Sequence, residues 1–227
     1  MLIAEDLLLL LTDDATGKAV VDGQRLDLAL AGSVLVELVI ARRAEVRTVQ
    51  GRFSSRAVVV PVTGPPTGDP VLDEALRRLA AGAPRTPQSA LGPLGKGLKD
   101  VLRDRLVARG ILRAEHGTVL GIFPTRAWPA VDSSHEAAVR AGLRDVLLTG
   151  RPPSDREASL VAVLHALDVV PKQFGDLGLD RRTLKARAGA IARHHVAGDA
   201  VRKAIEAVNA ATMAAVTAAG AAAAASS

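Results

Sequence analysis

Three basic side chains, Lys96, Lys99 and Arg103, follow a turn-forming stretch at spacings of three and four residues. On a helix this spacing places side chains on one face, so the three cations would form a narrow basic stripe. Lys96 and Lys99 would lie in the first turns, where free backbone N–H groups favour an anion. The pattern therefore indicates a site for a phosphate. The alternative is a solvated helix face, on which neighbouring carboxylates such as Asp100 pair with the basic residues.

Other kinds of chemistry find little support in the sequence. Residues 92–97 are rich in glycine, but they lack the first Gly and the final Ser or Thr that a phosphate-binding loop needs. His194 and His195 are adjacent, so they would point to different faces of a helix instead of sharing a metal ion. No Gly-x-Ser-x-Gly nucleophile elbow occurs. We therefore expect a protein that is not an enzyme and that has no metal site and no cofactor.

The composition limits the class of protein. The chain has 227 residues, of which 48% are hydrophobic and 23% charged, as expected for one globular domain or two small ones. The net charge of +5 and the pI of about 10.2 permit an anionic partner, such as a membrane or nucleic acid. Cysteine is absent, which excludes disulfides and fits a cytoplasmic protein. Aromatic residues make up only 2%, too few for a stacking platform for single-stranded nucleic acid.

Apolar residues at helical spacing predict a mainly α fold, a single compact helical-bundle domain over residues 1–208. Residues 209–227 form an Ala-rich, low-complexity tail. We expect no membrane-spanning helix, because no stretch approaches ~20 strongly apolar residues. The predicted helices cover 3–11, 26–41, 69–81, 96–109, 134–148, 154–167, 181–195 and 198–210. The other predicted elements are a short strand over 18–21, a small β-hairpin over 45–62, a loop over 82–93 and a projecting β-hairpin over 111–123, whose connection is 114–117.

The stretch 66–76, with the sequence PTGDPVLDEAL, combines a turn with a strong helix start. Asp69 is a favourable N-cap, and Pro70 would occupy the first helical position, where its missing N–H costs nothing. Asp73 and Glu74 would lie near the positive end of the helix dipole. This string is similar to a signature of the Golgi phosphoprotein 3 family, in which a Pro-Thr-Gly-Asp turn precedes a Leu-Asp-Glu-Ala-Leu helix start.

Four further segments resemble the same family in the same order. Residues 3–10 (IAEDLLLL) resemble its opening Met-Glu-Glu-Val-Leu-Leu-Leu, and 31–38 (AGSVLVEL) resemble its Gly-Cys-Met-Leu-Ile-Glu-Leu helix. Residues 104–112 resemble its Leu-Val-Glu-Lys-Gly-Val-Leu lead into a hairpin, and 159–169 its Leu-Ala-Leu-Ile-x-Leu-Ala-x-Ala-x-Asp-Val segment. The resemblance spans most of residues 1 to about 208 and implies a compact, mostly helical domain with a projecting β-hairpin.

The resemblance also implies a function. Family members bind phosphatidylinositol 4-phosphate through a basic pocket, and two of its basic positions fall on Lys96 and Lys99. A pocket Trp should lie near Val21, where this chain has none, and a pocket Arg falls on Ala31. The Arg-rich arm that engages vesicle-coat proteins in eukaryotic members has no counterpart. We therefore expect Lys96, Lys99 and Arg103 to bind anionic, phosphoinositide-like headgroups at the cytoplasmic face of a membrane, driven mainly by charge.

The projecting hairpin provides membrane and self-association surface in the family. Its counterpart here has Val119, Ile122 and Phe123 as apolar candidates, with Trp128 close behind. We expect these residues to meet either the lipid interface, where Trp is favoured, or a second copy of the chain. The alternative is that the hairpin folds back on its own domain, because an isolated hairpin is not stable alone.

The alternative function is nucleic-acid binding by a winged-helix-like domain. A basic helix over 96–109 that is followed by a hairpin would mimic such a domain, and the high pI fits it. A winged helix would, however, form a separate domain of ~80 residues with its own core. The apolar helices of this chain run on continuously, so we favour the membrane interpretation and do not expect a nucleic-acid partner.

Overall fold

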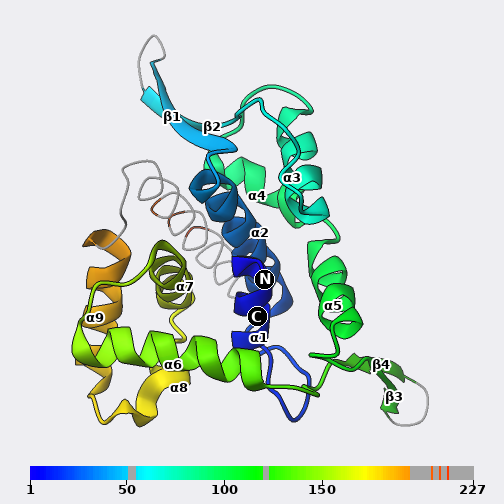
Figure 1. The fold of residues 1–227 in the computed structure, drawn as a ribbon, viewed down its shortest axis with the longest axis vertical. Coiled ribbons are helices and arrows are strands. Elements are labelled where there is room, and N and C mark those ends of the chain that lie inside the picture. The colour runs from blue at the N-terminus through cyan, green and yellow to red at the C-terminus, as the bar shows by residue number, and fades with distance from the viewer. Residues whose placement is uncertain (51–54, 120–122, 195–205, 207–209, 211–213, 215–227) are drawn as a thin grey trace, which may run out of the picture.

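The structure, a computed structural model, describes residues 1–50, 55–119, 123–194, 206, 210 and 214. These residues form a mainly helical fold with two separate two-stranded antiparallel sheets, which confirms the predicted fold class (Figure 1). The helices are α1 (Ile3–Leu10), α2 (Gly23–Ile40), α3 (Pro70–Ala80), α4 (Pro87–Gly95), α5 (Leu98–Ala108), α6 (Ser134–Thr149), α7 (Asp155–Ala166), α8 (Val170–Phe174) and α9 (Arg181–His194). The strands are β1 (Ala44–Gln50), β2 (Ser55–Pro61), β3 (Glu115–Val119) and β4 (Phe123–Ala127).

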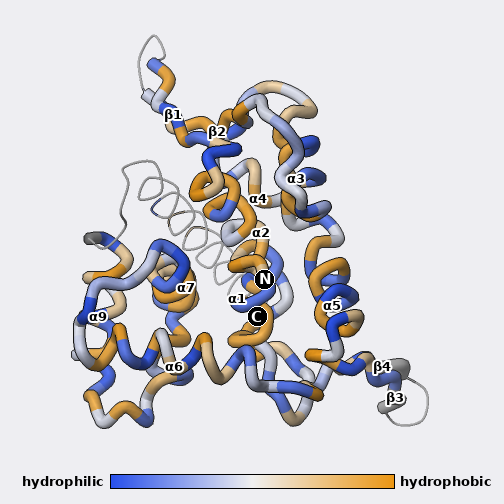
Figure 2. The backbone as a smooth tube through the Cα atoms, in the orientation of Figure 1, coloured by the Kyte–Doolittle hydropathy of each residue, from blue (hydrophilic) through white to orange (hydrophobic). Residues whose placement is uncertain are grey.

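Helix α1 lies at the centre of the hydrophobic core. All eight of its residues are buried, and it packs against α2, α5, α6 and α7 (Figure 1). Hydrophobic residues run along both α1 and α7, where Figure 2 shows them in orange. A helix that is covered on every side needs apolar side chains all round, and the four consecutive leucines of α1 supply them. No helix in the described ranges is long and apolar enough to cross a membrane.

Two acidic residues of α1, Glu5 and Asp6, are buried within this core. Buried charges need partners, and basic side chains from three other helices supply them. Arg105 of α5 donates to Glu5 over 2.9 Å. Arg156 of α7 donates to Asp6 over 2.8 Å, and the His135 ring of α6 lies 2.8 Å from the same carboxylate. These contacts hold the helices that surround α1 in place.

The segment 82–93, predicted to be a loop, contains most of helix α4 instead. Thr86 caps this helix by accepting the N–H of Ser89 over 3.2 Å, and Pro87 occupies the first helical turn. Pro93 lies inside the helix, where it has no N–H to donate to the preceding turn. The prolines and glycines suggested a loop, but a proline just after a cap is also a helix-start signal. The apolar side chains of Ala90, Leu91 and Leu94 are buried.

The first predicted hairpin is confirmed, whereas the second is displaced along the chain. Strands β1 and β2 pair in the expected region. Strands β3 and β4 pair from Glu115 with Ala127 to Val119 with Phe123, so the predicted connection 114–117 mostly lies within β3. The prediction was wrong because Leu112 is needed in the core at the end of α5, where it is buried. Residues 18–21 form no strand, and only an isolated bridge joins Thr12 to Ala19.

The C-terminal predictions fall mostly outside the described residues. These are the helix over 198–210 and the Ala-rich tail over 209–227. The division into a domain over 1–208 and a tail therefore stays a prediction.

Candidate functional site

The predicted basic stripe is divided between two elements. Helix α5 begins at Leu98, and Gly97 before it adopts a left-handed conformation with φ of +71°. Lys96 caps the end of α4, so it does not lie in the first turn of α5 as expected. Lys99 and Arg103 do lie on α5, one turn apart on one face. The left-handed Gly97 breaks what the sequence suggested was one continuous helix.

The two residues of the basic stripe that lie on α5 already have partners within the protein. The Lys99 ammonium lies 2.9 Å from a carboxylate oxygen of Asp27 on α2. The Arg103 guanidinium lies 3.7 Å from the carboxylate of Asp100 and 3.6 Å from the centre of the Trp128 ring. The Arg103 side chain is only 12% exposed, and burial lowers its pKa. The main contact of Arg103 is therefore a cation–π interaction with Trp128, and little of its charge is accessible to a ligand.

Trp128 thus belongs to the basic cluster and not to the projecting part of the hairpin. It follows β4, it is half-buried, and its backbone N–H donates to the carbonyl of Gly17 over 3.2 Å. The sequence placed Trp128 with the hairpin and Arg103 with the headgroup site, and the structure brings the two together. The spacing of residues along the sequence could not predict this contact, because the two residues belong to different elements.

The apolar candidates of the second hairpin lie at its far end. Strands β3 and β4 extend away from the helical body beside the end of α5 (Figure 1). Val119 and Phe123 form the last backbone pair of this hairpin. Ile122 lies outside the described residues. The membrane or self-association role of this hairpin therefore stays a prediction.

A shallow, open depression of about 420 Å³ lies between α2 and the turn that joins α4 to α5. Lys96 lines it, and among the described residues its ammonium has no ion-pair partner. The first backbone N–H groups of α5, which begins at Leu98, also have no partners within their own helix. The lining residues are Gln24, Asp27, Leu28, Leu91, Gly92, Gly95, Lys96 and Gly97. The depression offers an anion one free cation and a helix N-terminus.

Two features of α2 change the electrostatics of this depression. Ala31, at the position where the family resemblance puts an Arg, is fully buried. A Cβ added at Gly95 of α4 would lie 3.5 Å from the Cβ of Ala31, so α2 and α4 approach closely here. Asp27 lines the depression and neutralises Lys99. An incoming anion must therefore compete with the Asp27 carboxylate.

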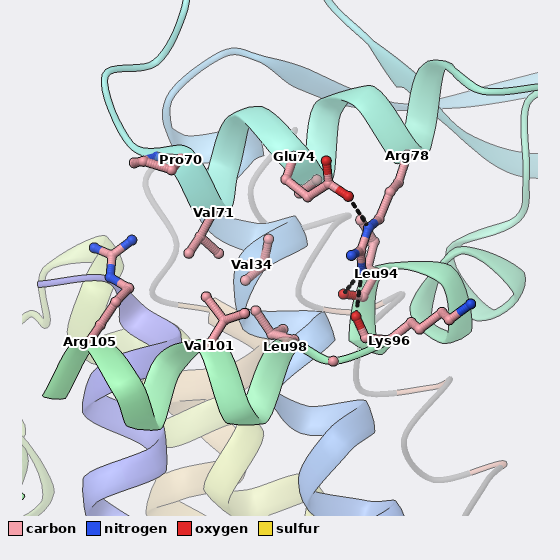
Figure 3. Close-up of a pocket in the computed structure, with 12 residues that line it drawn as sticks. Val34, Pro70, Val71, Glu74, Arg78, Leu94, Lys96, Leu98, Val101 and Arg105 are labelled. Carbon is pink, nitrogen blue, oxygen red and sulfur yellow. Dashed lines mark hydrogen bonds and ion pairs between the residues drawn. The ribbon is translucent and has the colours of Figure 1, made fainter. Parts of the chain in front are cut away.

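An apolar cavity of about 350 Å³ lies on the opposite side of the same turn, between α3 and α5. Val71 of α3 and Val101 of α5 point toward one another across it, with Val34 of α2 at its floor (Figure 3). Lys96 and Gly97 line this cavity as well as the shallow depression. The turn over 95–97 therefore separates a polar surface site from an apolar one.

A third cavity, of about 240 Å³, is polar and contains a buried carboxyl group, that of Glu136 on α6. Glu136 is 5% exposed and accepts a hydrogen bond from Arg140 over 2.7 Å. Burial raises its pKa to about 7, and the nearby Asp14 adds to this effect. Because the folded protein binds this proton more tightly than the unfolded chain, the resulting stability is complete below about pH 4.5 and is lost as the pH rises through about 7.

We expect Glu136→Gln to remove this pH dependence. The amide stays neutral at every pH, whereas the buried carboxyl group must ionise as the pH rises. The unfolding free energy of the variant minus that of the parent should therefore be about 2–3 kcal/mol larger at pH 8 than at pH 4. Urea unfolding of both proteins at pH 4, 6 and 8 measures this. A parent–variant difference that stays constant over that range would contradict the assignment.

Comparison with known proteins gives one match of large extent. The family model described as Golgi phosphoprotein 3 (GPP34) matches residues 3–208, which include all of the elements that build the depression and the apolar cavity. No curated protein matches the chain significantly.

Proposed function

Because the chain belongs to the Golgi phosphoprotein 3 family, we propose that it is a peripheral membrane-binding module for anionic headgroups of the phosphatidylinositol 4-phosphate type. The observation that carries this proposal is the shallow depression at the turn over 95–97, which is lined by Gly97, the N-cap of α5, and by Lys96, whose ammonium has no ion-pair partner among the described residues. Lys99 adds a second cation beside it once Asp27 is displaced. The role is one of binding and of recruitment to the cytoplasmic face of a membrane, without catalysis.

The shape of the depression supports a ligand that stays attached to a surface. A small soluble substrate is usually enclosed in a deep pocket, whereas a headgroup in a bilayer must be reached from outside. Basic residues near an anionic membrane each contribute ~1 kcal/mol. Within the described residues the site has one lysine without an ion-pair partner and one, Lys99, that is shared with Asp27. Its strength is moderate and depends on charge, because no Arg stands at Ala31 and no Trp at Val21.

Charge reversal at the two lysines tests this function. Lys96→Glu together with Lys99→Glu should weaken binding to vesicles containing phosphatidylinositol 4-phosphate at least tenfold, since two attractions become repulsions. Co-sedimentation with vesicles measures this. Binding of the parent should also fall as salt rises, because exposed charges are screened over ~8 Å at physiological ionic strength. The same experiment on Asp27→Asn should show stronger binding, because Lys99 is released from its intramolecular partner.

The matched control is Arg181→Glu together with Arg182→Glu, which makes the same four-unit change of charge on α9, far from the depression (Figure 1). It should bind vesicles nearly as the parent does. Unchanged binding by the double lysine variant would refute the site. Equal binding to duplex DNA, with the same dependence on Lys96, would favour the nucleic-acid alternative.

A further inference from the structure

The apolar cavity between α3 and α5 has the size and lining of a ligand site. Its volume of about 350 Å³ falls within the roughly 300–1,000 Å³ that is typical of small-molecule pockets. Hydrocarbon side chains form its walls and floor, with Val71, Leu98 and Val101 pointing inward (Figure 3). Val101 is 47% exposed at its mouth, although a large apolar side chain is normally buried.

The charged side chains at the two ends of this cavity are already paired. At one end, Arg78 donates to Glu74 over 2.7 Å and to the carbonyl of Lys96 over 2.7 Å. At the other end, Arg105 donates two hydrogen bonds of 2.7 Å to Asp69. A polar group that entered the cavity would lose its water, and the arginines and carboxylates described at its two ends already have partners. The cavity is therefore suited to hydrocarbon alone.

The position of the cavity indicates which hydrocarbon it would take. Lys96 and Gly97 line both the cavity and the shallow depression, so a ligand with an anionic head in the depression would have its tail beside the end of the cavity that these two residues line. The Lys96 carbonyl is fixed by Arg78, while its side chain extends away from the cavity (Figure 3). An amphiphile matches this combination of an apolar cavity with a cation that has no ion-pair partner among the described residues.

We propose that the cavity between α3 and α5 holds one acyl chain of the lipid whose headgroup occupies the Lys96 depression. This proposal rests on the proposed function and deepens it. The headgroup gives charge recognition, and the chain adds apolar burial, which strengthens binding by roughly fourfold for each methylene that leaves water. The protein would then bind a lipid partly drawn from the bilayer.

The test compares water-soluble phosphatidylinositol 4-phosphates with butanoyl and octanoyl chains by isothermal titration calorimetry. The parent should bind the octanoyl lipid at least tenfold more tightly than the butanoyl lipid. Val101→Trp fills the cavity mouth and should abolish this preference while it preserves butanoyl binding. Val101→Asp, which closes the mouth with charge at the same exposed position, should do the same if the Trp variant fails to fold. Val131→Trp, at a position 60% exposed and outside the cavity, is the matched control and should behave as the parent.

The outcomes separate this proposal from the proposed function. Equal affinity of the parent for both chain lengths, or a preference that survives both Val101 variants, overturns the acyl-chain site and leaves headgroup binding intact. If neither lipid binds, the headgroup function fails, and displacement of a fluorescent apolar dye by dodecanoate then reads the cavity directly. If dodecanoate displaces the dye from the parent but not from Val101→Trp, the acyl-chain site is supported. If it does not displace the dye from the parent, the site is overturned.

Discussion

Replacing Glu5 by alanine is expected to lower the free energy of unfolding by about 3–5 kcal/mol. The carboxylate is completely buried. It accepts hydrogen bonds from the Leu2 N–H over 2.7 Å, from Arg105 over 2.9 Å and from Arg109 over 3.1 Å. Without it, the two arginines lose a common partner and the first turn of α1 loses its cap. Urea unfolding followed by circular dichroism measures the change from the shift in midpoint.

The matched control is Glu45→Ala on the exposed strand β1. Glu45 pairs with Arg47 over 2.7 Å, a distance as short as those around Glu5, but these two side chains are 44% and 59% exposed, whereas that of Glu5 is completely buried. Exposed pairs contribute about 0–1 kcal/mol, so this change should have little effect. Similar losses for the two variants would contradict the view that burial makes the Glu5 network important.

Local signals in the sequence predicted most of the helices. The helix predicted over 69–81 is α3, with Asp69 as its N-cap and Pro70 in its first turn. Ser154 and Glu157 form a capping box at the start of α7, where a helix over 154–167 was predicted. These signals succeed because a cap, a first-turn proline and an apolar stripe act within one or two turns of chain.

The turn over 95–97 was not predictable in the same way. The sequence from 92 to 97 contains three glycines and a proline, and each of them is compatible with a loop, a helix end or a kink. Whether the chain is broken there depends on how Leu94 and Leu98 reach the core, and both are buried. Lys96 consequently lies at a helix end, and the stripe that the spacing predicted has only two members on α5.

Contacts between distant elements set the character of the site, and spacing carries no information about them. The ion pair between Lys99 and Asp27 makes the Lys99 ammonium less available to an anion than the sequence suggested. The stacking of Arg103 on Trp128 turns a predicted headgroup ligand and a predicted membrane residue into one packed unit. The residues of the site could therefore be proposed from the sequence, whereas their availability to a ligand needed the structure.

Gly17 holds Trp128 in this unit, and Gly17→Ala is expected to lower the unfolding free energy by about 2–5 kcal/mol. The glycine has φ of +63°, where an L-residue costs roughly 1–2 kcal/mol. A Cβ at this position would also lie 2.2 Å from the backbone nitrogen of Trp128 and 2.4 Å from that of Pro129. Backbone atoms cannot move aside cheaply, and overpacking of this kind adds about 1–3 kcal/mol.

The same change should displace the indole ring from Arg103. Trp128 is the only tryptophan in the chain, so intrinsic fluorescence reports its environment directly, and a red shift of emission is expected in the folded variant. Gly110→Ala provides the control, because Gly110 has a similar φ of +71° but no atom within 4 Å of an added Cβ. It should lose only the conformational cost of about 1–2 kcal/mol and keep the parent fluorescence. Equal losses and equal spectra for the two variants would show that the contact between Gly17 and the Trp128 backbone does not position the ring.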